Sequence, residues 1–125
     1  MVTWFIMLGS NLLYPMLMLI AARLFIKGAP KNINSLYGYR TTMSMKNQDT
    51  WQFAHAVAGK FWFRWSWVSL VIAIVPMLFT LGQSEDTICT VGLVLTVVLL
   101  IPLVAVIPHT ETALRRTFDE DGYRR

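Results

Sequence analysis

Three long apolar stretches constrain the fold of this chain more than any other feature of its sequence. They run over about residues 3–26, 61–81 and 88–107, and the only charged residues within them are Arg23 and Arg64, each near one end. A helix rises about 1.5 Å per residue, so each stretch is long enough to cross a hydrocarbon core of about 30 Å. We therefore expect an all-α integral membrane protein with three transmembrane helices.

The composition supports a membrane protein and removes several other classes. Charged residues make up only 14 % of the chain and hydrophobic residues 55 %, whereas soluble domains carry about 25 % charged residues. The single cysteine, Cys89, excludes an intramolecular disulfide and a cysteine-based metal cage, and is expected to be an apolar residue of the third span. The net charge of +4 does not predict nucleic-acid binding, because the basic residues flank the apolar stretches, where membrane lipid is the expected partner.

The distribution of charge predicts an orientation. All 11 lysine and arginine residues lie in or beside the loop 28–60 or in the tail 108–125, so the connection between the second and third spans has none. The positive-inside rule then places the N-terminus outside and both the loop and the tail in the cytoplasm. No basic residue precedes the first stretch, and it is longer than the ~7–15-residue core of a signal peptide, so we expect it to be retained as a span.

Two short helices are predicted in addition to the spans. The Gly28–Pro30 segment is expected to end the first helix. Asn47 can cap a helix whose faces differ in polarity, which predicts an interfacial amphipathic helix lying along the headgroups before the second span. Thr110 is a candidate cap for a short amphipathic helix in the cytoplasmic tail, where Glu111 and Arg115 are four residues apart.

Small and polar residues within the spans predict helix packing. Asn11 should face another helix, because an unpaired amide is costly in the hydrocarbon core. Small residues that permit close approach of helices recur in the second and third spans: Ser66, Ser69, Ala73, Gly92 and Thr96. A homodimer through these faces is also plausible.

The loop and the tail are expected to bring polar side chains together at the inner membrane boundary. Arg40 is predicted to pair with Glu111 or with an acidic group of a ligand, because ionic contacts at such a boundary are stronger than in bulk water. The alternative is a salt bridge that only fastens the tail to the loop. The candidate cluster for binding a partner or ligand consists of Tyr39, Arg40, Ser44, Lys46, Asn47, Trp51, His55, His109, Thr110 and Glu111.

Catalytic chemistry has weaker support in the sequence. His55, His109 and Glu111 are the residue types of a catalytic zinc site, but His109 and Glu111 are two residues apart and do not share a helical face. Loop hydroxyls such as Thr41 and Ser44 lack a glycine elbow and are more typical of turns and caps. No phosphate-binding glycine motif is present. No cofactor is therefore predicted, and an enzyme is an alternative to a binding protein.

The loop and tail also carry a family resemblance. The run YGYRTTMSMKNQDTWQFAHAVAGK, which begins at Tyr37, resembles the signature of the SdpI family of bacterial membrane proteins. The tail HTETALRRTFDEDGYRR is similar to the closing segment of that family. The matching positions are Tyr39, Arg40, Ser44, Met45, Lys46, Asn47, Trp51, His55, Gly59, Thr110, Glu111, Phe118, Asp119 and Gly122.

The resemblance implies a function. The family is named after an immunity protein that protects a cell from its own secreted, membrane-active toxin and, with toxin bound, holds a cytoplasmic transcriptional repressor at the membrane. The outside surface and the spans would then sense a peptide toxin, and the loop and tail would hold a cytoplasmic regulatory protein. We expect a multi-pass protein of the bacterial cytoplasmic membrane that acts in toxin immunity and signalling. A membrane enzyme or small transporter, and a structural subunit, are the alternatives.

Overall fold

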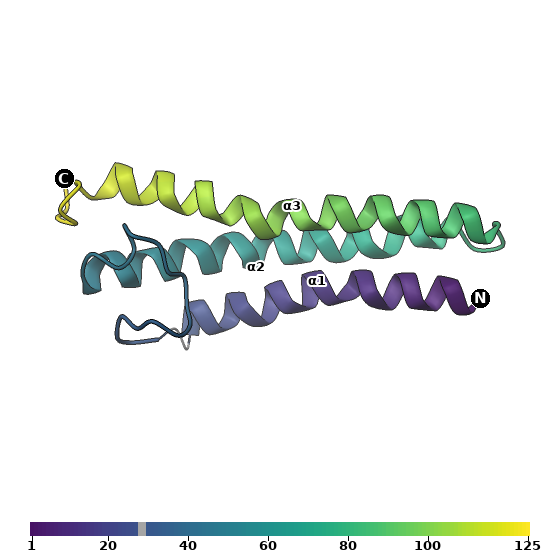
Figure 1. Ribbon diagram of the computed structural model, residues 1–125, viewed down its shortest axis with the longest axis horizontal. Helices are drawn as coiled ribbons and strands as arrows, with labels where there is room; N and C mark the ends of the chain where they lie inside the picture. The colour runs from purple at the N-terminus through teal and green to yellow at the C-terminus, as the bar shows by residue number, and fades with distance from the viewer. Residues whose placement is uncertain (28–29) are drawn as a thin grey trace.

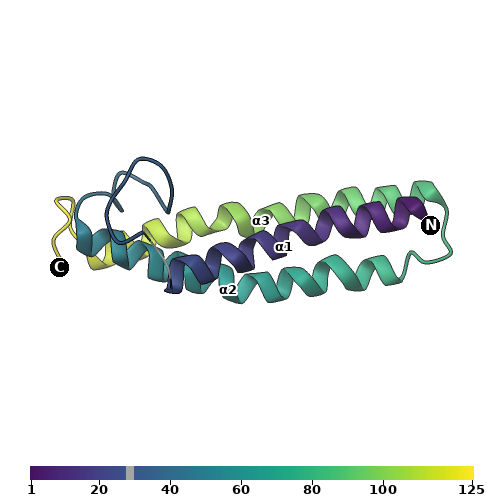
Figure 2. The same cartoon turned by 90° about the horizontal axis from the view of Figure 1, so that it is seen from below.

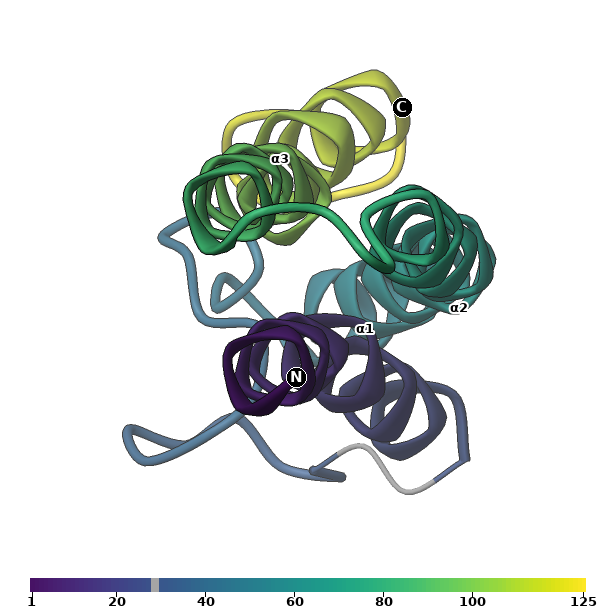
Figure 3. The ribbon, with the colours of Figure 1, turned by 90° about the vertical axis from the view of Figure 1, so that its right-hand side faces the viewer.

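The computed structural model, which describes residues 1–27 and 30–125, is an elongated bundle of three antiparallel α-helices. They are α1 (Val2–Lys27), α2 (Gln48–Leu78) and α3 (Glu85–Thr117). The helices run side by side along the bundle (Figures 1 and 2), and seen along its length they form a triangle (Figure 3). Within the described ranges the structure has no strand, only an isolated bridge between Phe118 and Arg124.

Each helix contains an apolar stretch long enough to cross a membrane. Only 22 % of the residues in each such stretch are buried inside the bundle. Many of the remaining apolar side chains are exposed on the outside of the bundle, which is costly in water but favourable in lipid. The prediction of an all-helical protein with three membrane-spanning helices is confirmed.

Two of the predicted helices are not separate elements. The expected interfacial helix after Asn47 is the first part of α2, which continues without a break into the apolar stretch. The expected tail helix is the last part of α3, so Thr110 is a buried residue inside a helix and not a cap. The predictions were wrong because both segments pack on each other: Ala54 and Ala58 of α2 share a core with Leu114 of α3, and continuous helices bury these faces. The predicted turn over Gly28 and Ala29 lies outside the described residues.

Inside the membrane stretches, polar and small side chains pack between helices as predicted. The Asn11 amide donates to the Gly92 carbonyl at 3.0 Å and accepts from the Thr96 hydroxyl at 2.7 Å, so α1 is bonded to α3. Ser66, Ser69 and Ala73 are fully buried within the bundle. A homodimer would therefore have to use other surfaces.

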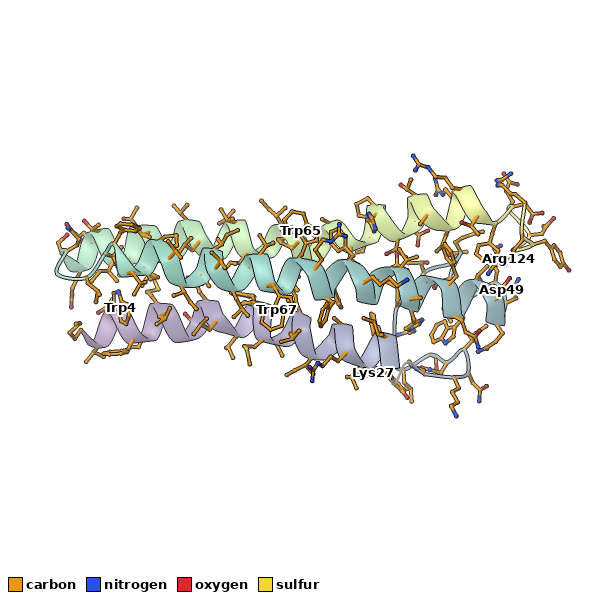
Figure 4. All side chains as sticks on the ribbon, turned by 180° about the vertical axis from the view of Figure 1, so that it is seen from behind. Trp4, Lys27, Asp49, Trp65, Trp67 and Arg124 are labelled. Carbon is orange, nitrogen blue, oxygen red and sulfur yellow. The ribbon has the colours of Figure 1, made fainter. Side chains whose placement is uncertain are left out.

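The loop and the tail meet at one end of the bundle, which we call the loop end. It comprises residues 30–47, the start of α2, the end of α3 and the C-terminus (Figure 1). The N-terminus and the α2–α3 connection lie at the opposite end, where Trp4 donates from its ring nitrogen to the Met77 carbonyl at 2.8 Å (Figure 4). The fold thus brings together two polar segments that are far apart in the sequence.

Candidate functional site at the loop end

Tyr39 connects the loop to both α2 and α3. Its backbone N–H donates to Nε2 of His55 at 2.9 Å, and its hydroxyl donates to Oε1 of Glu111 at 2.9 Å. Gly38, the preceding residue, has a φ of 112°, and a Cβ there would lie 2.7 Å from the same His55 nitrogen. Glycine is therefore required before Tyr39, because other residues rarely adopt this conformation and no side chain fits. Burial, and then the Glu111 carboxylate, raise the pKa of the Tyr39 hydroxyl, so it remains a proton donor.

His55 anchors the loop and is not free to act as a base. Its Nδ1 lies 2.8 Å from the carbonyl oxygen of Trp51, while Nε2 accepts from Tyr39. This pair of bonds requires the neutral ring with its proton on Nδ1. His55 precedes the apolar run of α2, and burial against Trp51 and Phe25 lowers its pKa and so favours the neutral form. Its role is to position the loop.

The hydroxyls of the loop make turns and a helix cap, as their sequence context predicted. Ser44 is fully buried, accepts from the Thr41 N–H at 2.9 Å and lies 3.0 Å from the Tyr39 carbonyl. Asn47 caps α2, because its side-chain oxygen accepts from the Thr50 N–H at 2.9 Å and the Thr50 hydroxyl accepts from the Asn47 N–H at 3.1 Å. These bonds engage Ser44 in structure, so it is a poor candidate for a nucleophile.

The C-terminal tail is fastened to the start of α2. Asn47 donates from its amide nitrogen to the Gly122 carbonyl at 2.6 Å. Asp49 accepts two hydrogen bonds from Arg124, at 2.9 Å from Nε and 2.8 Å from Nη2, and Figure 4 shows this pair at the tip of the bundle, beyond Lys27. The Arg124 guanidinium also lies 4.9 Å from the centre of the Phe118 ring. Sequence reasoning missed this ion pair, although Asp49 is the one acid between residues 28 and 60 and the tail ends in two arginines.

The predicted pair of Arg40 and Glu111 does not form. Glu111 instead accepts from Tyr39, while the Arg40 side chain is exposed and makes no ion pair with any described residue. The reason is the direction of neighbouring side chains: with its N–H bonded to His55, Tyr39 points into the bundle, and the next residue points outward. Arg40 and Glu111 nevertheless both lie at the loop end. The predicted Glu111–Arg115 pair is also absent from the ion pairs of residues 1–27 and 30–125.

The remaining predicted site residues divide into buried supports and surface groups. Trp51 is fully buried and donates from its ring nitrogen to the Pro30 carbonyl at 2.7 Å. Thr110 is fully buried, and its hydroxyl finds no hydrogen-bond partner in the described chain. Lys46 and His109 are exposed.

The three residues of the metal hypothesis do not gather. His55 uses both ring nitrogens, Glu111 is bonded to Tyr39, and His109 lies against Phe61 with ring centres 4.7 Å apart. Across residues 1–27 and 30–125, no group of three histidine, cysteine or acidic side chains could hold a metal ion. The zinc alternative is therefore wrong for this arrangement.

A cavity of about 730 Å³ lies between the loop and the tail at this end. Its wall combines basic side chains from both segments with acidic side chains of the tail, and Phe118 and Met43 add apolar surface. A cavity with both signs of charge and an apolar patch fits a protein segment better than a simple anion or cation. The charged lining residues are Lys46, Glu111, Arg115, Asp119, Glu120 and Arg125.

The three apolar helices define a multi-pass helical membrane protein, and the hydrogen-bonded polar cluster forms one end of it. The chain matches the SdpI/YfhL protein family over residues 31–108, more than half of its length, and it belongs to that family. The resemblance read from the loop is thereby confirmed. The match includes Tyr39 and His55 and ends just before His109, so the tail half of the cluster lies beyond it. No curated protein and no solved structure matches the chain.

Proposed function

We propose that the protein acts in toxin immunity in the bacterial cytoplasmic membrane and signals through its loop end. Two findings support the proposal: membership of the SdpI/YfhL family and three membrane-spanning helices. All 11 basic residues lie in or beside the loop or in the tail, so the positive-inside rule places the loop end in the cytoplasm. A peptide toxin would then meet the opposite end or the lipid-facing helices.

The cavity between the loop and the tail carries the proposal, because it is a place where a cytoplasmic regulatory protein can bind. The bonds of Tyr39 to His55 and Glu111 fix one wall of the cavity, and the Asn47–Gly122 bond fixes the tail beside it. Lys46 and Arg115 stand exposed on its rim. A pre-ordered wall reduces the conformational entropy lost on association, and the exposed charges on its rim favour a partner of complementary charge.

Neighbouring arginines on α3 allow a matched test. Arg115 and Arg116 are both exposed, but Arg115 lines the cavity and Arg116 does not. The assay is survival of cells that express the chain and are challenged with a membrane-active peptide toxin that kills the unprotected strain. We expect Arg115→Ala to lose protection and Arg116→Ala to keep it, at equal amounts of protein in the membrane.

Three further variants test the rest of the cluster. Arg40→Ala, Asn47→Ala and Glu111→Ala should each abolish protection without removing the protein from the membrane, because each changes the loop end alone. Membrane fractions probed for an attached tag give the amount of protein. Full protection by all three variants, together with equal protection by the two arginine variants, would refute the proposal.

A further inference from the structure

A second cleft, separate from the loop–tail cavity, lies between α2 and α3. It has a volume of about 520 Å³, and its wall combines Lys60, Arg64 and His109 with the aromatic rings of Phe61 and Trp65. None of the residues that line it is acidic. Lys60 and Arg64 are four residues apart in α2, so both project from the same helical face.

The basic side chains of this cleft are not used by the protein itself. In the part of the chain that the structure describes, the one ion pair within 4.0 Å is between Asp49 and Arg124. Lys60 and Arg64 therefore have no carboxylate partner there, and both are exposed. Two unpaired cations beside apolar rings favour an anionic ligand that also has an apolar part.

The cleft lies where the apolar surface of the bundle begins. Trp62, next to the cleft, stacks on Phe25 near the end of α1, with ring centres 5.6 Å apart. From this level α2 exposes Trp65 and α3 exposes Ile107 to the surroundings. Tryptophan and basic residues at such a boundary mark the headgroup level of a bilayer. The cleft is thus at the depth of lipid phosphates.

We propose that this cleft binds the headgroup phosphate of an anionic phospholipid in the leaflet at the loop end. Arg64 and Lys60 contact the phosphate oxygens, because a guanidinium donates two parallel hydrogen bonds and an ammonium supplies a compact charge. The lipid chains then lie along Trp65 and the apolar side chains beyond it. This site does not depend on the proposed immunity function, since it uses different residues from the loop–tail cavity.

The binding test uses the full chain, purified in a neutral detergent and titrated with phosphatidylglycerol or phosphatidylcholine, with bound lipid counted by native mass spectrometry. We expect preferential binding of phosphatidylglycerol. Lys60→Gln with Arg64→Gln should weaken it about twenty-five-fold, at about five-fold per basic residue. The matched control, Arg23→Gln with Lys27→Gln, removes two cations of α1 outside the cleft and should leave the affinity unchanged.

A fluorescence test remains available if the double variant fails to fold. Trp65 lines the cleft, while Trp67 does not and lies on the other side of α2 (Figure 4). In vesicles, brominated phosphatidylglycerol should quench tryptophan emission more than brominated phosphatidylcholine, and Trp65→Phe should remove this difference while Trp67→Phe keeps it.

Three results would overturn the proposal. The first is equal weakening by the cleft and control variants, which would show general attraction to basic residues. The second is a quenching difference that survives Trp65→Phe. The third is displacement of the lipid by millimolar inorganic phosphate, which would identify a soluble anion as the ligand of the cleft.

Discussion

Asn47 performs two tasks that a single substitution can separate. Its side-chain oxygen caps α2 by accepting from the Thr50 N–H at 2.9 Å, and its side-chain nitrogen holds the tail by donating to the Gly122 carbonyl at 2.6 Å. Asn47→Ala removes both bonds. Asn47→Ser keeps an oxygen that can cap the helix, but serine has no nitrogen to donate and is too short to reach the tail.

The magnitudes follow from the two bonds. Loss of a helix cap costs about 1 kcal/mol, and loss of a partly buried hydrogen bond costs about 1 kcal/mol. Asn47→Ala should therefore lower the free energy of unfolding by about 2 kcal/mol, and Asn47→Ser by about 1 kcal/mol. Both variants lose the same tail bond, so both should raise the population of detached tail about five-fold.

Two assays read these quantities separately. Unfolding by sodium dodecyl sulfate in mixed micelles, followed by far-ultraviolet circular dichroism, gives the free energy of unfolding. Limited trypsin digestion of the bond between Arg124 and Arg125, followed by intact mass, reports the population of detached tail, because the cleavage rate tracks the population of the open state. Gln52→Ala is the control: Gln52 is exposed on α2, one turn beyond the cap.

The reasoning fails if trypsin cleaves Asn47→Ser at the wild-type rate, because the bond from Asn47 to Gly122 would then not hold the tail in place. It also fails if Asn47→Ser and Asn47→Ala lower the free energy of unfolding equally, because the cap would then contribute nothing.

Three further predictions concern other parts of the molecule. Asn11→Ala loses two hydrogen bonds to α3, and at about 0.6 kcal/mol each in a membrane it should lower the free energy of unfolding in the same micelle assay by about 1 kcal/mol; no loss would contradict the packing role. The pKa of His55 is lowered from 6.5 by burial, so the unfolded chain binds the proton more tightly and stability should fall as pH drops below about 6.5. In His55→Gln that part of the pH dependence should vanish, and its persistence would assign the effect to another group. Cys89, the single cysteine, is partly buried near the start of α3 at the end opposite the loop; a membrane-impermeant maleimide should reach it from outside intact cells if at all, and labelling only from the inside would reverse the orientation.

The three spans could be predicted from the sequence because the length of an apolar stretch is a local property. The helix ends within the loop and tail could not. The chain changes from polar to apolar residues near Phe61 and from apolar to polar residues after Ile107. Each change resembles a boundary between two helices. Whether the chain bends there depends on the contact of Ala54 and Ala58 with Leu114, which are more than fifty residues apart in the sequence.

The same division applies to the site. The cap at Asn47 was predictable, because it depends on residues three positions apart. The partner of Glu111 was not, because opposite charge favoured Arg40, while the anchoring of Tyr39 by His55 determines which side chain points inward. Long-range contacts of this kind depend on side-chain direction, which a single sequence does not reveal.

The unbroken course of α3 gives the molecule a mechanical property. Its 33 residues span about 50 Å and join the α2–α3 connection to the wall of the cavity. A tilt of about 5° about its midpoint would displace the tip at the loop end by about 2 Å, and bending is expected at Pro102 and Pro108, which interrupt the helical hydrogen bonds. A displacement of α3 at the α2–α3 connection would therefore move the wall of the cavity at the loop end.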